Sequence, residues 1–139
     1  MSAESLKRER RSRAEACPLF PRPERVPLEV LELLREGQNR ACFLVTCDGG
    51  RTRGVLKVAR ERLRAEHEAL LRYQRELGDV LPRPLAYWEE NGTQYLLREY
   101  VAGPTLAELY HADAPLSQKR LLAVADALAL ALGRLHAAG

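Results

Sequence analysis

The sequence lacks the long apolar run that a membrane-spanning helix needs. Such a helix takes about 20 predominantly apolar residues. The longest candidate here, residues 127–133, is bounded by Asp126 and Arg134. The basic residues near the N-terminus are followed by no apolar stretch, which argues against a secretory signal peptide. The sequence therefore predicts no membrane segment.

Paired cysteines are also missing. Cys17, Cys42 and Cys47 make an odd number, and no two of them have the C-x-x-C spacing. This pattern argues against both a disulfide framework and a zinc site. Unpaired thiols are typical of a reducing compartment, so the composition predicts a cytoplasmic protein.

The excess of charge of one sign is small. The formal net charge of +3 does not by itself indicate nucleic-acid binding. Much of the excess lies before residue 14, in a stretch that could form a charged helix but has no apolar stripe. Prolines at 18, 21, 23 and 27 then disfavour regular structure. The basic run could bind RNA or a membrane surface, but no aromatic residue is interleaved with it. We therefore interpret residues 1–26 as a solvated tail and expect no nucleic-acid partner.

The remaining residues show strand-like and helix-like patterns. The turns Asp48-Gly49-Gly50 and Asn91-Gly92 are strong hairpin signals. Residues 30–36 fit a helix as well as a strand, and the turn-like residues 37–39 after them favour a strand. The predicted strands are 30–36, 41–47, 53–59, 85–89 and 93–101, and the predicted helices are 61–77, 105–110 and 117–138. We expect an α+β fold, a five-stranded antiparallel sheet with helix 61–77 packed on it.

One predicted strand is apolar around a single lysine. Residues 52–59 read T-R-G-V-L-K-V-A, and apolar side chains at alternate and adjacent positions indicate a strand that is covered on both faces. A lysine in such a strand is costly unless its ammonium finds a partner or a ligand. Lys57 is therefore the first candidate functional residue.

A carboxylate lies inside the apolar stripe of helix 61–77. Glu66 follows Leu63 by three positions and precedes Leu70 by four, so it shares their face. We predict that Glu66 pairs with Lys57. Two alternatives stay open: Glu66 could lie at the edge of the stripe and reach water, and Glu68 could be the partner of the lysine.

Helix 117–138 is apolar on most sides. A helix of this kind is usually surrounded by other structure. It therefore predicts self-association or a partner protein bound through this helix.

The order of these elements resembles the small lobe of the protein-kinase-like fold and the first helices of its large lobe. It is most similar to bacterial kinases related to aminoglycoside and choline phosphotransferases. V-L-K-V-A at 55–59 resembles the strand whose lysine holds the α- and β-phosphates of ATP. Glu66 resembles the helix glutamate that fixes this lysine. L-L-R-E-Y-V-A-G-P-T-L at 96–106 resembles the hinge, and the resemblance covers residues 28–139.

The resemblance implies an ATP site. Lys57 would bind phosphate, Glu66 would orient it, and the backbone near Glu99 and Val101 would face adenine. Gly37 lies in the loop that would cover the phosphates, where protein kinases have G-x-G-x-x-G and this chain has one glycine. The loop is more similar to that of the small-molecule phosphotransferases. The implied boundaries are a small lobe over 27–100 and a hinge with the start of a large lobe over 101–139.

Two further departures accompany the resemblance, besides the single glycine of the phosphate loop. Arg98 occupies a hinge-entry position that is usually apolar, so it could narrow or repolarise the adenine pocket. The catalytic loop with its aspartate and asparagine, and the later metal-binding aspartate, have no counterpart up to Gly139. We expect a truncated phosphotransferase with no catalytic or metal-binding residue, inactive alone, which would bind Mg-ATP once the missing lobe is supplied. The alternative is a pseudokinase-type binding or regulatory module.

Overall fold

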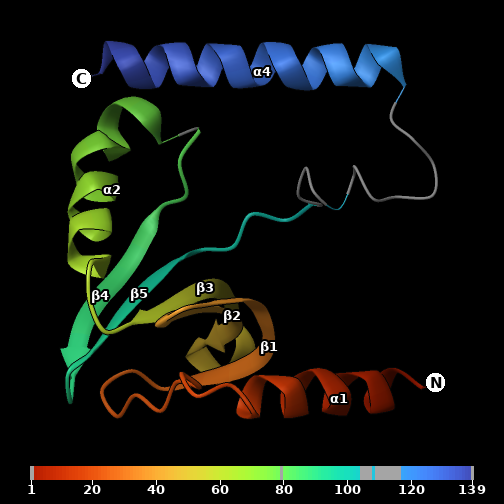
Figure 1. The fold of residues 1–139 in the computed structure, drawn as a ribbon, viewed down its shortest axis with the longest axis vertical. Helices are drawn as coiled ribbons and strands as arrows, with labels where there is room; N and C mark the ends of the chain where they lie inside the picture. The colour runs from red at the N-terminus through yellow and green to blue at the C-terminus, as the bar shows by residue number, and fades with distance from the viewer. Residues whose placement is uncertain (1, 79, 104–107, 109–116, 139) are drawn as a thin grey trace.

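The computed structural model describes residues 2–78, 80–103, 108 and 117–138. Within them five antiparallel strands form one sheet in the order β1-β2-β3-β5-β4 (Figure 1). The elements are α1 (Ala3–Glu15), β1 (Leu28–Gly37), β2 (Arg40–Cys47), the 3-10 turn η1 (Asp48–Gly50), β3 (Thr52–Ala59), α2 (Leu63–Leu77), β4 (Pro84–Glu90), β5 (Thr93–Glu99) and α4 (Gln118–Ala137). The α+β class and the five-stranded sheet are confirmed. The predicted helix over 105–110 lies almost wholly outside the described residues.

Both predicted hairpins form at their turn signals. Between β4 and β5, Asn91 and Gly92 have φ angles of 51° and 77°. Two consecutive positive φ angles are the mark of a type I′ turn, whose twist matches that of the flanking strands. Between β2 and β3 the chain turns through η1, with φ of 68° at Gly49. These turns set the register that brings the site residues together.

Helix α2 covers one face of the sheet. Its buried side chains are Leu63, Leu70 and Leu77. Leu63 and Leu70 pack in one cluster with Ala59 of β3 and Leu96 of β5. The Leu63 N–H donates to Gln94 Oε1 at 2.9 Å, which ties the start of the helix to β5. The first turn of α2 is thereby held over β3.

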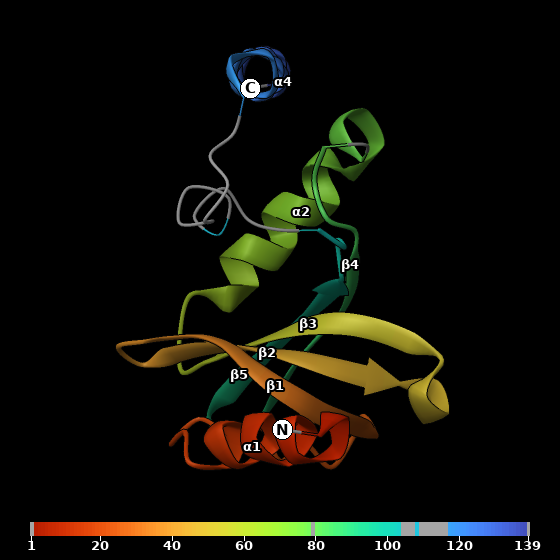
Figure 2. The ribbon, with the colours of Figure 1, turned by 90° about the vertical axis from the view of Figure 1, so that its right-hand side faces the viewer.

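The opposite face of the sheet is covered by residues expected to be a solvated tail. Figure 2 shows the sheet between α1 on one side and α2 on the other. Ala14 is 0% exposed and Cys17 is 6% exposed, and both belong to the main core cluster with Phe43 and Leu56. The expectation of a solvated tail over 1–26 is therefore wrong for this part of the chain.

Helix α1 attaches without an apolar stripe because its contacts come from its last turns and from polar groups. Arg11 Nη1 donates to the Val30 carbonyl at 2.5 Å. The same guanidinium lies 5.5 Å from the centre of the Phe20 ring, a cation–π distance. Arginine can cover apolar surface with its stem while its head stays polar. A search for apolar periodicity cannot detect a helix held in this way.

Cover on both faces accounts for the apolar character of β3. Leu56 and Val58 belong to the cluster on the α1 side, whereas Ala59 belongs to the cluster under α2. The expectation that this strand is covered on both faces is confirmed. The second cover is the N-terminal segment, which the sequence did not suggest.

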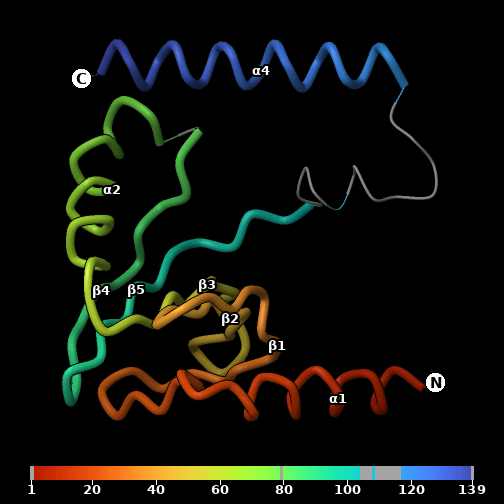
Figure 3. The backbone as a smooth tube through the Cα atoms, in the orientation of Figure 1, coloured from red at the N-terminus to blue at the C-terminus, as the bar shows by residue number. Residues whose placement is uncertain are grey.

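Helix α4 lies on the α2 side of the molecule, away from α1 (Figure 3). It starts at Ser117, whose Oγ accepts from the Arg120 N–H at 3.3 Å. Arg134 Nη2 donates to the Glu76 carbonyl at 2.8 Å, a contact with α2. The large apolar side chains that α4 exposes are Leu121, Leu122, Leu128, Leu130, Leu132 and Leu135. Among the helices of the described ranges, none has the length and apolar character to cross a membrane.

We expect Gly54→Ala in β3 to destabilise the protein by about 1–3 kcal/mol. A Cβ at this position would lie 2.8 Å from Leu97 Cδ1 and 3.2 Å from the Arg98 carbonyl, closer than the neighbouring strand allows. Urea unfolding measures the loss. The control is Gly133→Ala in α4, where a Cβ meets nothing within 4 Å. An equal effect of the two substitutions would contradict this packing.

Candidate functional site

The predicted ion pair forms between β3 and α2. Lys57 Nζ donates to Glu66 Oε1. The side chains are 25% and 34% exposed, so the pair is partly shielded from water. Glu68 points elsewhere and pairs with Arg64 at 3.3 Å on the surface. The pairing of Lys57 with Glu66 is confirmed, and Glu68 is excluded as the partner of the lysine. Glu66 also keeps partial access to water, as expected for a residue at the edge of the apolar stripe.

Lys57 opens onto a cavity of about 560 Å³. The walls come from β1, β2, β3, the first residue of α2, the end of β5 and the chain that follows it. Gly37 and Val101 also line this cavity. Glu66 does not line it, so it acts on the cavity only through Lys57.

The cavity is rich in positive charge. Its cationic lining residues are Arg35, Arg40, Lys57 and Arg98. Among the described residues that line it, the one carboxylate is that of Glu108. The surplus of positive charge would attract an anionic ligand, and it would do so more strongly where water is partly excluded.

The strand register explains why these cations share one face. Directly opposed residues in an antiparallel sheet point to the same side. Arg35 is opposite Cys42, and Cys42 is opposite Lys57. Arg40 is opposite Ala59, and Val55 is opposite Arg98, one row to either side of Lys57. Two cations that sequence reasoning did not assign to the site, Arg35 and Arg40, therefore lie on the face of Lys57. Arg98, which the sequence placed at the entry to the adenine pocket, lies on the same face.

Cys42 is a cavity residue that sequence reasoning also missed. Burial raises the pKa of its thiol, and the nearby positive charges of Lys57 and Arg98 offset part of this effect. The alternation of residues 41–47 could have placed Cys42 on the face of Lys57, but only once the hairpin register was known.

Of the two predicted hinge residues, Val101 lines the cavity and Glu99 does not. Val101 is 65% exposed. The N–H of Glu99 and one oxygen of its carboxylate are engaged by the Arg83 backbone. The Glu99 N–H donates to the Arg83 carbonyl at 2.9 Å, and Glu99 Oε1 accepts from the Arg83 N–H at 2.7 Å.

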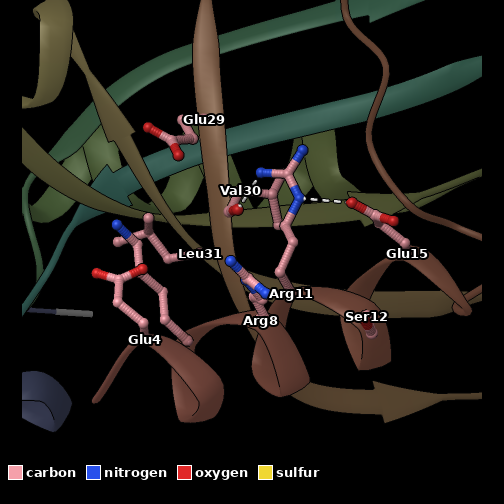
Figure 4. A pocket seen from close by; sticks show the side chains of 9 residues that line it. Glu4, Arg8, Arg11, Ser12, Glu15, Glu29, Val30 and Leu31 are labelled. Atoms are coloured by element: carbon pink, nitrogen blue, oxygen red, sulfur yellow. Dashed lines mark hydrogen bonds and ion pairs between the residues drawn. The ribbon is translucent and has the colours of Figure 1, made fainter. Parts of the chain in front are cut away.

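A second cavity, of about 600 Å³, lies between α1 and β1 (Figure 4). It contains none of the predicted site residues. Arg11 crosses it, donating to the Val30 carbonyl and, at 2.8 Å, to Glu15 Oε1. Arg11 is used in fixing α1 to the sheet, and we assign this cavity no ligand.

The described residues at the Lys57 cavity do not form a metal centre by themselves. In the part of the chain that the structure describes, no three His, Cys, Asp or Glu side chains are grouped to hold a metal ion. Glu66, the nearest carboxylate to Lys57, is engaged in the ion pair. We therefore derive no step through a metal.

Comparisons with known proteins give one family. No curated protein matches. Among solved structures, the M. tuberculosis PknI kinase domain is similar with 23% identity and a TM-score of 0.48. That match covers 81% of this chain and 48% of the other, so the chain spans about half the length of that domain. The model of the phosphotransferase enzyme family matches residues 7–139, nearly the whole sequence. The protein therefore belongs to the phosphotransferase enzyme family, as its kinase-like order of strands and helices predicts.

Proposed function

We propose that the chain is the nucleotide-binding part of a kinase-like phosphotransferase. The ligand of the Lys57 cavity would be a nucleoside triphosphate, and the resemblance implies ATP. The observation that carries this proposal is the partly buried lysine that Glu66 fixes at the edge of a cavity with surplus positive charge. Membership of the phosphotransferase family supports the same reading.

The chemistry of the cavity suits a triphosphate. Lysine and arginine form charge-assisted hydrogen bonds with phosphate oxygens, and these are stronger than neutral ones. Lys57 would hold phosphate from the centre of the face, with Arg35 beside it and Arg40 in the next row. The carboxylate of Glu66 would keep the ammonium in place before the ligand arrives, which lowers the entropic cost of binding.

Gly37 would lie close to the same phosphates. It ends β1 and is opposite Arg40 in the register. A Cβ on Gly37 would meet Arg40 Cγ at 3.6 Å, an ordinary contact, so packing within the chain does not require glycine here. The free space beside the backbone supports close approach of a ligand at this turn.

Bound nucleotide would supply the phosphoryl group that a phosphotransferase transfers. The chain's own residues would bind and orient it: Lys57 and the arginines at the phosphates, and the chain from Tyr100 to Gly103 at the base.

Protection of Cys42 tests the proposed site without any mutation. We expect Mg-ATP or Mg-GTP at saturation to slow alkylation of Cys42 by N-ethylmaleimide at least tenfold, because the nucleotide would cover the thiol. Peptide mass spectrometry measures all three cysteines in one sample. Because burial raises the pKa of Cys42, alkylation should keep accelerating as the pH rises above the range of an ordinary thiol.

Cys47 is the internal control for this experiment. It lies on the same strand, is half-buried and does not line the cavity. Its alkylation rate should not respond to nucleotide. Nucleotide binding that leaves Cys42 fully reactive would place the ligand elsewhere, and absence of binding at millimolar nucleotide would contradict the proposed function.

A second candidate function is a non-catalytic module that binds a protein partner. The exposed leucines of α4 favour it, because several large apolar side chains left in water on one helix invite association. The alkylation experiment separates the two candidates. A module without a nucleotide site would leave the reactivity of Cys42 unchanged by ATP and GTP.

A further inference from the structure

Among the described residues that line the cavity, Arg98 is the one whose side chain has a buried polar atom without a hydrogen-bond partner. Its Nε is buried and has no hydrogen-bond partner in the structure. Within the described ranges its guanidinium forms none of the ion pairs found, although other arginines do so on the surface. A buried donor without an acceptor is costly. Such a group at the wall of a cavity indicates that a ligand supplies the acceptor.

The register places Arg98 at the end of the cavity away from the Gly37 turn. Arg98 is opposite Val55, whereas Lys57 is opposite Leu96 in the next row of the same face. Two residues along a strand correspond to about 7 Å. Gly37 and Arg40 lie on the other side of Lys57. Arg98 is thus displaced from the three cations that would hold the phosphates, toward the chain after β5.

The surroundings of Arg98 at this end suit a flat base more than a phosphate. The cavity is lined there by Val55, Tyr100 and Val101, and Cys42 and Leu34 line the walls of the adjoining strands. Apolar walls with a few placed polar groups are typical of sites for small organic ligands. A triphosphate bound at Lys57 would direct its base into this part of the cavity.

A guanidinium distinguishes purines by their 6-position. Guanine offers two acceptors in a row, O6 and N7, which match the paired donors of arginine. Adenine replaces O6 by an amino group, which is a donor and meets the guanidinium donor to donor. We propose that Arg98 makes the cavity selective for a 6-oxopurine nucleotide, a guanine nucleotide, over an adenine nucleotide.

This inference rests on the proposed nucleotide site, and its test separates the two. Dissociation constants of Mg-ATP, Mg-GTP and Mg-ITP are measured by calorimetry on the full chain. ITP has the 6-oxo group of GTP without the 2-amino group. We expect GTP and ITP each to bind about tenfold more tightly than ATP, which corresponds to one good arginine–base interaction.

Arg98→Met keeps much of the side-chain volume and removes the donors. We expect it to weaken GTP and ITP binding about tenfold and to leave ATP binding equal or stronger. The control is Arg53→Met, an exposed arginine on β3 that does not line the cavity, which should change none of the constants. Circular dichroism checks that each variant is folded.

Three results would overturn the inference. Wild-type protein that binds ATP as tightly as GTP, or more tightly, would refute the base preference and leave the nucleotide site intact. An Arg98→Met variant that weakens ATP and GTP equally would assign Arg98 to the phosphates. Wild-type protein that binds no nucleotide would refute the proposed function, and the inference with it.

Discussion

A chain that lacks residues 1–20 should not fold cooperatively at room temperature. The deletion removes α1 and the segment after it, and it exposes the face of the sheet that carries Phe43, Val45 and Leu56, all 0% exposed in the full chain. Each fully buried side chain of this kind contributes about 1.5–3 kcal/mol. The free energy of unfolding of a typical domain is about 5–15 kcal/mol. Several such losses together are of this size. Circular dichroism and urea unfolding measure the outcome.

Two point variants test the same contact within the full-length chain. Ala14→Gln places a polar side chain in the core under α1, and it should cost about 1–3 kcal/mol. Ala16→Gln, two positions further on, adds the same side chain to an exposed site and should be nearly neutral. A deleted chain with a sharp unfolding transition, together with two Gln variants of equal stability, would show that the N-terminal segment is a tail after all.

Lys57→Ala should weaken nucleotide binding by about ten- to a hundredfold. Hydrogen bonds to a charged group contribute about 1.5–3 kcal/mol each, and Lys57 would make at least one with the phosphates. The loss should be the same for ATP and GTP, because the lysine contacts what the two nucleotides share. Calorimetry on the folded variant measures it.

The matched control for this substitution is Lys119→Ala. Lys119 is an exposed lysine at the start of α4, outside the cavity. The Lys119→Ala substitution lowers the net charge of the molecule by the same amount as Lys57→Ala, but it changes no residue of the cavity. If Lys119→Ala weakens binding as much as Lys57→Ala, the attraction is a general effect of net charge and the cavity is not the site.

The sequence predicts the site residues on β3 and α2 because each breaks a local pattern. Lys57 interrupts an apolar strand and Glu66 interrupts an apolar helix stripe, and each is costly to bury alone. An ion pair between the two residues accounts for both charges, so Lys57 and Glu66 can be paired from the sequence without knowledge of the fold. The hairpins are equally local, because Asn-Gly specifies its own turn.

The contribution of the N-terminal segment could not be predicted in this way. Its attachment depends on Ala14 and Cys17 at the end of a charged helix, and on Arg11, whose acceptor is a backbone carbonyl of β1. None of these has a periodic signature. Contacts between distant segments of this kind follow from the assembled sheet and not from the local sequence.

The residues of the Lys57 cavity could be predicted from the sequence only in part. Arg98 stands out in the sequence as a charge at a usually apolar position. That Arg35, Arg40 and Cys42 share the face of Lys57 follows only from the register of β1, β2 and β3. The engagement of Glu99 by Arg83 depends on how β4 and β5 meet, and it leaves the predicted hinge with one fewer backbone donor than expected.

The central claim is that Glu66 prepares Lys57 for a triphosphate. The most direct measurement compares the nucleotide dissociation constants of Glu66→Ala, Glu68→Ala and the double variant Lys57→Ala/Glu66→Ala. Glu66 and Glu68 are two positions apart on α2, but only Glu66 pairs with the lysine. We predict about tenfold weaker binding for Glu66→Ala, no change for Glu68→Ala, and a double variant no weaker than Lys57→Ala alone. Equal effects of Glu66→Ala and Glu68→Ala, or additive effects of the Lys57 and Glu66 substitutions, would contradict the claim.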